Sequence, residues 1–328
     1  MTDHLQNAAV SGQNASVSGQ SAATSGHYVM IAGPTAAGKS GLAMALAEYL
    51  GGVVINADSM QLYRDLRILT ARPEADDEAR VPHRLYGVVD GAERASVVRW
   101  LALAGEAVAG ARQDGRIPII IGGTGMYLKA ALDGIAAIPE VGQDILDSCM
   151  ATLSALGGAA FRAVLAKEDP VTAARLFDGD SQRLVRAMGV VRATGRPISE
   201  WQQDPHQGAL AGQAVTVAVT PPREAVYEAI NARFAAMMDS GAIEEVTALA
   251  ARGLDPGLPV MKAIGVREIM ALQQGQLDRA RVIELASRDS RHYAKRQFTW
   301  LRNNYNAQYV IESKFSERNL AEIFSILS

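Results

Sequence analysis

The first part of the chain alternates between short, continuous apolar runs and longer stretches in which apolar residues recur every three or four positions. The continuous runs cover 28–32, 53–55 and 117–121, and their length and composition predict buried strands. Helical spacing at 42–50 and again at 93–113 predicts amphipathic helices between these strands. Because strands that alternate with helices are typical of α/β folds, we expect a parallel sheet with helices on both faces.

The alternation stops in the middle of the chain and returns near its end. Between 131 and 201 there are several helix-like patterns and no strand-like run, which predicts a helical insertion. Residues 214–219 then alternate like a core strand, and Pro221-Pro222 opens a long helix. A last long helix spans about 279–302, and the residues after it predict a short strand and a closing helix.

These patterns also predict how the chain is divided. We expect an α/β core made of 27–130 and 202–328, interrupted by the helical domain 131–201. Residues 1–26 are rich in Ser, Gly, Ala, Gln and Asn, so they cannot bury enough apolar area to offset their chain entropy. That segment is therefore predicted to be a disordered tail.

Composition and charge exclude several classes of protein. The chain has 328 residues and one cysteine, Cys149, which excludes an internal disulfide framework and fits the reducing cytoplasm. No apolar run approaches the roughly 20 residues of a membrane span. No basic stretch leads into an apolar segment at the N-terminus, so we expect a cytoplasmic protein without a membrane partner. A net charge of −3 means that any surface for nucleic acid must be local.

The loop between the first predicted strand and the first predicted helix reads Gly33-Pro34-Thr35-Ala36-Ala37-Gly38-Lys39-Ser40. A strand, a glycine-bounded loop ending in Lys-Ser and a helix form the context of a phosphate-binding loop. Its backbone N–H groups and the helix N-terminus surround an anion. Lys39 would place a charge on the phosphates, and Ser40 would supply a hydroxyl to Mg²⁺. The loop predicts binding of a di- or triphosphate, with Mg²⁺ as cofactor.

Two other predicted strands also end in polar or flexible residues. Asp58 follows the second strand, at the sheet edge where α/β proteins bind ligands, and it could hold Mg²⁺ through water, accept a proton or cap a helix. Gly122-Gly123-Thr124 follows the third strand, where the glycines allow a ligand to approach the backbone closely. A plain strand-to-helix turn would use the same residues, so this stretch alone leaves both interpretations open.

Basic residues concentrate on two predicted helices. Between 181 and 199 there are four arginines and no acidic residue, and Arg183 and Arg186 lie one turn apart on a shared face. In the last long helix, cations are interleaved with aromatic residues between Tyr293 and Arg302. This combination suits single-stranded RNA, whose bases stack while its phosphates pair with cations, although a solvated helix face would look similar.

Two classes of enzyme fit these observations. A small-molecule kinase would use a nucleoside triphosphate with Asp58 as the base. Alternatively, the phosphate-binding loop would hold a diphosphate leaving group while the enzyme acts on RNA. The kinase hypothesis leaves the basic helices without a role, and an RNA-binding ATPase would need a metal-organising Asp after Ile121, where Gly122 stands.

A set of motifs, in order, resembles the tRNA dimethylallyltransferase (tRNA isopentenyltransferase) family. The resemblance covers about 28–305 and rests on Gly33–Ser40, Asp58-Ser-Met-Gln-Leu-Tyr-Arg64, Pro82-His-Arg-Leu85, Gly122-Gly-Thr-Gly-Met-Tyr127, Gln182-Arg-Leu-Val-Arg186, Asn231-Ala-Arg-Phe234, Lys262–Arg267 and Lys295-Arg-Gln-Phe-Thr-Trp-Leu-Arg302. It implies transfer of the dimethylallyl group from dimethylallyl diphosphate to the N6 amine of adenosine 37 in tRNA anticodon loops, by a P-loop-type enzyme that we expect to be a monomer. An adenylate isopentenyltransferase and a P-loop kinase are the alternatives.

The resemblance also implies a role for each matching residue. Asp58, Thr35 and Arg233 would be catalytic, and Ser40 would be the protein's ligand to the metal. The implied diphosphate-binding residues are Gly33, Pro34, Thr35, Ala36, Ala37, Gly38, Lys39, Ser40 and Thr124. The implied contacts to the tRNA anticodon stem-loop are Asp58, Ser59, Met60, Gln61, Thr124, Gln182, Arg183, Leu184, Val185, Arg186, Lys262, Arg267, Lys295, Arg296, Gln297, Trp300 and Arg302. Gln61 would read an edge of the flipped adenine.

Three positions depart from the family pattern. Leu69 replaces a glycine and Arg72 a lysine in the stretch 68–73, so the backbone shape and phosphate contacts of this loop were expected to differ. Leu146 stands near the place where relatives often carry an arginine that touches tRNA. The chain also carries no Cys/His pattern after its last long helix, so the zinc extension of some eukaryotic relatives is not expected.

Overall fold

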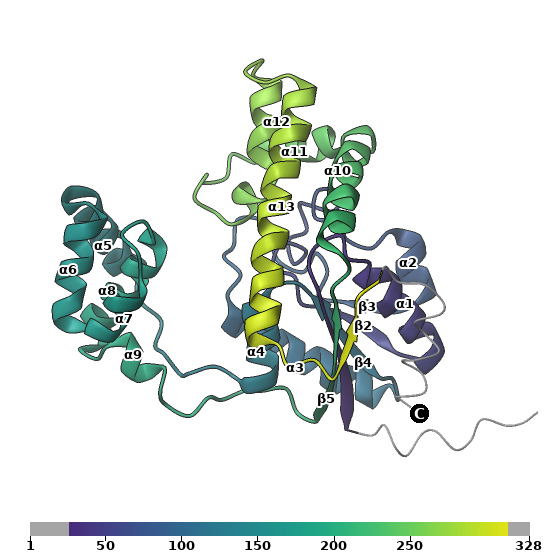
Figure 1. Cartoon of the computed structure of the whole chain (residues 1–328), viewed down its shortest axis with the longest axis horizontal. Helices are drawn as coiled ribbons and strands as arrows, with labels where there is room; N and C mark the ends of the chain where they lie inside the picture. The colour runs from purple at the N-terminus through teal and green to yellow at the C-terminus, as the bar shows by residue number, and fades with distance from the viewer. Residues whose placement is uncertain (1–25, 314–328) are drawn as a thin grey trace, which may run out of the picture.

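The computed structural model describes residues 26–313, and Figure 1 shows how they are arranged. Within this range a parallel sheet of six strands has the order β3-β2-β4-β1-β5-β6. The strands are β1 (His27–Ala32), β2 (Val53–Asn56), β3 (His83–Arg84), β4 (Pro118–Gly122), β5 (Gln213–Val219) and β6 (Tyr309–Ile311). All but residue 26 of the predicted tail, and the predicted closing helix, lie outside the described residues.

Helices cover both faces of this sheet because successive residues of a strand point to opposite sides. Met30 of β1 joins one apolar cluster, while Val29 and Ile31 join another. The helices outside the insertion are α1 (Lys39–Leu50), α2 (Ala75–Arg80), α3 (Val97–Gln113), α4 (Gly125–Asp133), α10 (Arg223–Asp239), α11 (Ala242–Ala251), the short 3₁₀ helix η1 (Val260–Lys262), α12 (Val266–Gln273) and α13 (Arg279–Asn304). The predicted fold class, an α/β fold with a parallel sheet and helices on both faces, is confirmed.

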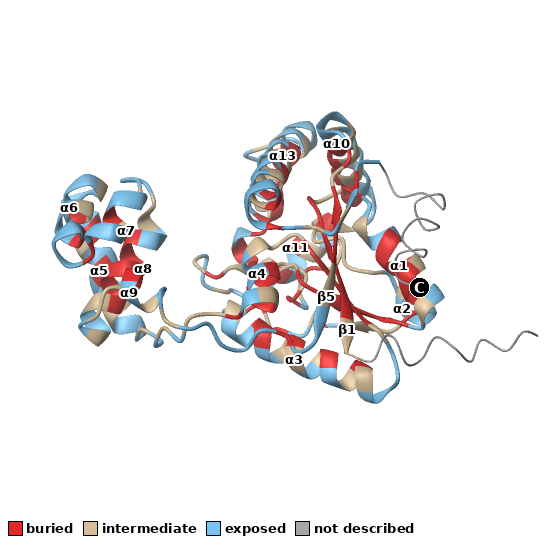
Figure 2. Cartoon of the chain, turned by 60° about the horizontal axis from the view of Figure 1, so that its bottom comes forward, coloured by how far each residue is buried: buried red, intermediate tan, exposed pale blue. Residues whose placement is uncertain are grey.

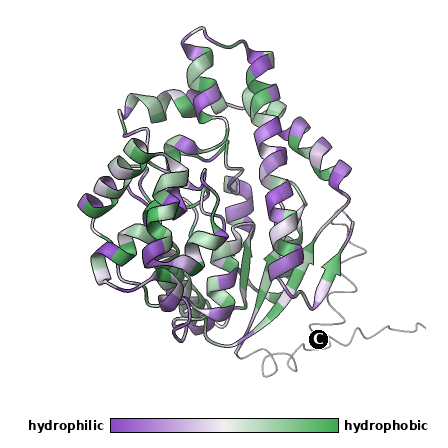
Figure 3. Cartoon of the chain, turned by 60° about the vertical axis from the view of Figure 1, so that its left-hand side comes forward, coloured by the Kyte–Doolittle hydropathy of each residue, from purple (hydrophilic) through white to green (hydrophobic). Residues whose placement is uncertain are grey.

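The two apolar clusters belong to different helices. Leu42 and Leu46 of α1 pack against one side of the sheet, and Trp100 of α3 packs on the other. Figure 2 shows the strands as the most continuously buried part of the core, and Figure 3 shows the same strands as strongly hydrophobic. None of the helices within 26–313 is both long and apolar enough to cross a membrane.

Five helices occupy the segment predicted as a helical insertion. They are α5 (Gln143–Leu156), α6 (Gly158–Glu168), α7 (Pro170–Arg175), α8 (Ser181–Thr194) and α9 (Ile198–Trp201). They pack around an apolar cluster of their own and lie to one side of the sheet, joined to it by two stretches of chain (Figure 1). Buried Asp169 fastens α7 to α9, because its carboxylate accepts hydrogen bonds from the N–H of Thr172 (2.9 Å) and the hydroxyl of Ser199 (2.7 Å).

The connection to these helices leaves the core slightly later than 131. Ala131 is fully buried among core residues, so α4 continues to Asp133 before the chain departs. The two connecting stretches meet at an isolated antiparallel bridge between Ile135 and Gln207. The division of the chain into a core and a separate domain stays a prediction.

Candidate active site

The loop between β1 and α1 has the backbone shape of an anion-binding site. Ala36 and Gly38 have positive φ angles of 62° and 91°, so the chain turns sharply in this loop. Gly33 is needed where the loop leaves β1, because a Cβ there would lie 2.6 Å from the carbonyl oxygen of Val219. The ammonium of Lys39 folds back and donates to the carbonyl of Pro34 over 2.7 Å.

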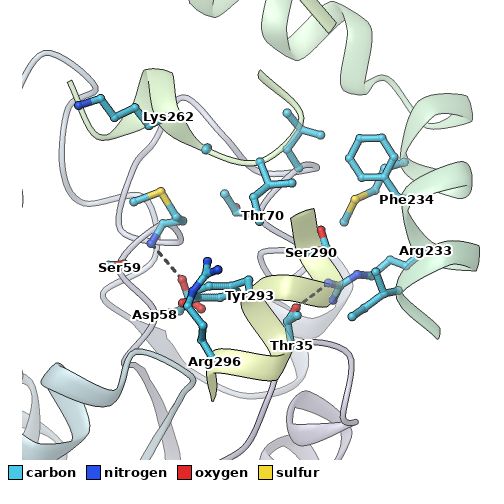
Figure 4. A pocket seen from close by; sticks show the side chains of 16 residues that line it. Thr35, Asp58, Ser59, Thr70, Arg233, Phe234, Lys262, Ser290, Tyr293 and Arg296 are labelled. Carbon is cyan, nitrogen blue, oxygen red and sulfur yellow. Dashed lines mark hydrogen bonds between the residues drawn. The ribbon is translucent and has the colours of Figure 1, made fainter. Parts of the chain in front are cut away.

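Thr35 is held in this loop from two sides. Its hydroxyl accepts a hydrogen bond from Arg233 of α10 at 2.6 Å, as the dashed line in Figure 4 shows. Its backbone N–H donates to the side-chain oxygen of Gln297, on α13, at 2.8 Å. Thr35 and Arg233, predicted to act together, are therefore in direct contact.

Asp58 lies just past β2 and is oriented by a buried asparagine. Asn56 is fully buried; its side-chain oxygen accepts from the N–H of Asp58 (2.8 Å), and its amide donates to the carbonyls of Asp58 (2.9 Å) and Leu85 (3.0 Å). One carboxylate oxygen of Asp58 accepts from the N–H of Met60 at 3.0 Å (Figure 4). This turn fixes the backbone of Asp58 and leaves the carboxylate at the wall of two cavities.

The Gly122-Gly123-Thr124 loop lies beside this aspartate. A Cβ on Gly122 would lie 2.2 Å from the carbonyl oxygen of Ala57, so the two strand ends pack together without a side chain between them. The hydroxyl of Thr124 accepts from the N–H of Ser59 at 3.0 Å. Thr124 therefore joins the loop after β4 to the turn after β2, rather than facing the phosphate loop alone.

Two cavities meet at these residues. A smaller one, of about 290 Å³, is shown in Figure 4, and a larger one, of about 680 Å³, extends along the phosphate loop. Residues that line both are Thr35, Asp58, Thr70, Arg233 and Met237. The smaller cavity has an apolar wall formed by α10 and the loop before α12, with Tyr293 and Arg296 of α13 opposite. The larger cavity contains Lys39 and Ser40.

Burial shifts the pKa values of ionisable side chains where the two cavities meet. Desolvation lowers the pKa of Lys39 to about 8; Arg233 acts in the same direction, and Asp58 opposes both. Desolvation also lowers the pKa of Arg233 and raises that of the Tyr293 hydroxyl. The junction thus places cationic and anionic side chains where little water screens them, so a bound anion would interact strongly with its cations.

Ser40 is in a position to serve a metal ion that arrives with a polyphosphate. It is in the first turn of α1 and lines the larger cavity. Nowhere in the described part of the chain do three His, Cys, Asp or Glu side chains gather as a metal site by themselves. One hydroxyl beside a phosphate cradle suits Mg²⁺, which keeps most of its waters and takes its remaining ligands from phosphate oxygens.

The loop 66–73 lines both cavities and is held from two sides. The Glu245 carboxylate of α11 accepts from three successive N–H groups, those of Arg67, Ile68 (2.8 Å) and Leu69 (3.0 Å). The Gln61 amide donates to the carbonyls of Thr70 (2.8 Å) and Ala71 (3.0 Å). The side-chain N–H groups of Gln61 therefore stabilise this loop. Gln61 lines the larger cavity, whereas Ser59 and Met60 line the smaller one.

Two of the departures from the family pattern lie in this loop. Leu69 does not have a positive φ, so its backbone does not require the usual glycine; its side chain lies against Gly265 and lines the smaller cavity. Arg72 packs over Gly87, and its guanidinium points to the carbonyls of Tyr63 (3.4 Å) and Arg64 (3.5 Å).

The insertion exposes only part of its predicted RNA-binding motif. The Arg183 side chain is 76% exposed, and Gln182 is also exposed on the same helix. Arg186 is half-buried and reaches the carbonyl of Pro139 at 3.4 Å. Leu184 (0% exposed) and Val185 (5%) lie in the apolar cluster of the insertion, so the prediction that they contact tRNA is wrong for their side chains.

Leu146, the third departure, also packs inside the insertion. It contributes to the apolar cluster and lies against Gly189 of α8, so an arginine at this position would have to leave the cluster to reach RNA.

On α13 the predicted contacts divide between an outer and an inner face. Lys295, Arg296 and Arg302 are exposed, whereas Trp300 packs over Gly125 at the start of α4. Gln297 is 5% exposed, and both ends of its amide bind other protein groups; the prediction that it contacts tRNA is therefore wrong for this arrangement. Near the N-terminus of α13, cations are paired with acids, as in Arg281–Glu284 and Arg288–Asp289.

Lys262 and Arg267, the remaining predicted contacts, lie at the mouth of the smaller cavity and on α12. Both are exposed, and Lys262 lines that cavity. The site also contains two side chains that the sequence patterns did not reveal, namely Asn56 and Glu245. Asn56 ends a buried strand, and this placement of a polar residue was the one signal that pointed to it.

Comparisons with known proteins show which family the chain resembles. A family model described as IPP transferase matches residues 61–304, and one described as Isopentenyl transferase matches 26–92. A tRNA dimethylallyltransferase of Rhodospirillum rubrum is 50% identical over 304 residues, which cover 91% of this chain and 93% of the relative. Another, from Rhodopseudomonas palustris, is 48% identical over 292 residues, covering 88% and 92%.

Solved structures show the same similarity in three dimensions. The full-length tRNA isopentenylpyrophosphate transferase from Bacillus halodurans superposes with a TM-score of 0.65 at 31% identity, covering 92% of this chain and 95% of that one. A eukaryotic dimethylallyltransferase acting on tRNA superposes with a TM-score of 0.78 at 25% identity, covering 92% and 80%.

Proposed function

Because this chain belongs to the IPP transferase family, we propose that it is a tRNA dimethylallyltransferase. It transfers the dimethylallyl group from dimethylallyl diphosphate to the N6 amine of adenosine 37 in the anticodon loop and releases diphosphate. The observation that carries this proposal is the junction of two cavities at Thr35, Asp58 and Arg233. The phosphate-binding loop lines the larger cavity, and the smaller cavity lies beside the basic helix α13.

The reaction forms one bond and breaks one. The lone pair of the adenine N6 attacks C1 of the dimethylallyl group, and the C1–O bond breaks so that its electron pair leaves with the diphosphate. N6 gives up one proton. An exocyclic amine conjugated to a purine is a weak nucleophile, so a nearby base and a stabilised leaving group both lower the barrier.

Asp58 is the proton acceptor in this proposal. Its carboxylate faces the point where the cavities meet, and one oxygen is already committed to the N–H of Met60. The other oxygen remains for the N6 hydrogen. Because Asn56 fixes the backbone of Asp58 through three hydrogen bonds that include Leu85, the carboxylate needs little reorganisation during the reaction.

The phosphate loop binds the leaving group. Free N–H groups of this loop and Lys39 would surround the diphosphate, and the Thr35 hydroxyl, held by Arg233 at 2.6 Å, would contact the bridging oxygen as it gains charge. These groups stabilise the transition state more than the ground state, because the charge on that oxygen grows as the C1–O bond breaks. Bound Mg²⁺, with Ser40 as its protein ligand, would neutralise part of the diphosphate charge.

The acceptor base enters the smaller cavity. Ser59 and Met60 line it, Tyr293 and Arg296 provide a ring and a cation beside it, and Lys262 lies at its edge. Flipping a base costs a few kcal/mol, and least in a loop where it is already unpaired. The exposed cations of α13 and Arg183 of the insertion bind the backbone of the anticodon stem-loop, largely without reading its sequence.

The enzyme is proposed to work as a monomer in the cytoplasm. Its single cysteine suits a reducing compartment.

One assay tests the proposal. Purified protein is incubated with Mg²⁺ and labelled dimethylallyl diphosphate, and total tRNA or AMP is the acceptor; a parallel reaction contains labelled ATP and small acceptors. We expect label in tRNA alone. Label in AMP would favour the adenylate isopentenyltransferase, and phosphate transfer from ATP without use of dimethylallyl diphosphate would favour a kinase.

A further inference from the structure

The side chain of Gln297 connects α13 to two separate loops of the active site. Its oxygen accepts from the backbone N–H of Thr35 at 2.8 Å, and its amide donates to the carbonyl of Gly123 at 3.0 Å. It is 5% exposed, although its sequence neighbours Lys295 and Arg296 are exposed. One helix therefore presents cations outward and a buried amide inward.

The Gln297 amide is packed closely against the loop after β4. A Cβ on Gly123 would lie 2.1 Å from the side-chain nitrogen of Gln297 and 3.1 Å from the carbonyl oxygen of Gly33. The two loops and the glutamine thus lie close together, and a side chain on Gly123 would displace the Gln297 amide.

A second residue of α13, one turn earlier, reaches the same region. Tyr293 lines the smaller cavity together with Thr35 and Asp58. If α13 lifted away, the N–H of Thr35 and the carbonyl of Gly123 would lose these partners. Packing of α13 against these loops therefore stabilises the observed conformation of the phosphate-binding loop, and that conformation stabilises the packing of α13.

We propose that Gln297 is a positioning residue that couples RNA binding on the outer face of α13 to the geometry of the phosphate loop. This inference rests on the proposed function. RNA bound to the cations of α13, with a base beside Tyr293, holds the helix against the loops. The seated helix fixes the backbone of Thr35 and directs its hydroxyl toward the diphosphate. RNA and diphosphate then favour the same state, so each strengthens the binding of the other.

Binding measurements with inorganic diphosphate and Mg²⁺ test this coupling without turnover. The dissociation constant of diphosphate is measured with and without an anticodon stem-loop RNA, for the wild type and for Gln297→Met. In the wild type, we expect the RNA to lower the dissociation constant of diphosphate about 5-fold or more. In the variant, the dissociation constants with and without RNA should be the same, a ratio of about 1. RNA affinity without diphosphate should stay within about 3-fold, because Gln297 is buried and does not face RNA.

The matched control is Gln308→Met, which removes another glutamine that accepts from a backbone N–H, that of Thr216 at 3.0 Å, between β5 and β6. This variant should keep the wild-type coupling. Gln297→Glu decides the question should the methionine variant fail to fold: its carboxylate still accepts from Thr35 but repels the Gly123 carbonyl, so coupling should again be lost.

Wild-type coupling in a folded Gln297 variant would overturn the inference. So would a wild type that modifies tRNA but binds diphosphate equally well with and without RNA. Failure of the wild type to modify tRNA at all would instead overturn the proposed function, so the two failures are distinguishable.

Discussion

The guanidinium of Arg233 donates a hydrogen bond of 2.6 Å to the hydroxyl of Thr35, although 198 positions separate the two residues. Arg233 is on α10, in the second half of the core, and Thr35 is in the phosphate loop. The contact joins α10 to the phosphate-binding loop, where we propose that the leaving oxygen gains charge. Because the two side chains are in direct contact, the effects of mutating them on the free energy of activation should not add.

This pair predicts the outcome of a double-mutant cycle. Thr35→Val and Arg233→Gln should each lower kcat by about 10²–10³-fold, the range for a lost transition-state donor. The double variant should lose little more than the worse single variant, because removing either partner already disrupts the pair. Single-turnover rates at saturating donor and tRNA provide the measurement, and losses that multiply would show that the two residues act independently.

Replacing the proposed base separates chemistry from binding. Asp58→Ala should lower turnover by about 10²–10⁴-fold and leave tRNA binding nearly unchanged. Asp58→Asn is the conservative partner, since its side-chain oxygen can still accept from the N–H of Met60 and keep the turn intact. Filter binding of tRNA and initial rates are compared for both. Equal loss of binding and turnover would contradict the role of Asp58 as base.

The lowered pKa of Lys39 predicts an alkaline limit for the free enzyme. The Lys39 ammonium is charged below its pKa of about 8 and becomes neutral as the pH rises through that value. A diphosphate prefers the charged form, so kcat/KM for the donor should be constant below this pH and fall about tenfold per unit above it. At saturating donor the limit should move upward, because the bound anion raises the pKa of the ammonium. In Lys39→Met the residual diphosphate affinity should no longer show this step.

Replacing Glu245 should lower the stability of the protein and the order of the loop 66–73. Glu245→Ala leaves three adjacent N–H groups without their acceptor and should lower the free energy of unfolding by about 1–3 kcal/mol. It should also raise KM, because the loop with Leu69 and Thr70 lines the cavities. Urea denaturation and steady-state kinetics measure the two effects. The neighbouring Glu244 is exposed on the same helix, so Glu244→Ala should change neither; equal effects of both would argue against a specific anchor.

Arg183 and Leu184 are adjacent in the sequence but should have opposite phenotypes. Exposed Arg183→Ala should weaken tRNA binding and reduce its salt dependence by about one counterion, with stability unchanged. Buried Leu184→Ala should lower the free energy of unfolding by about 2–5 kcal/mol and leave the salt dependence of binding intact. Thermal melts and titrations at several salt concentrations distinguish them. A change in salt dependence in Leu184→Ala alone would reverse our assignment of the two faces.

Much of the core was predictable because its signals are local. The runs of β1 and β4 and the spacing of α3 and α13 are each contained within one element, so the sequence pattern predicted them to within a few residues. β3 is only two residues long, too short for any period to show. The motif Gln182–Arg186 illustrates a second limit, since Arg183 and Leu184 match the same motif although one is exposed and the other is buried.

The sequence alone determined the α/β class, the phosphate-binding loop and Asp58 at a strand end, because each depends on neighbours in the chain. Only the tertiary structure decided that Arg233 and Gln297 meet at Thr35, from 198 and 262 positions away. Spacing along a chain carries no information about such distances. The packing of α10 and α13 beside the sheet determines these distances. It also determines which side chains face the cavities and which are buried.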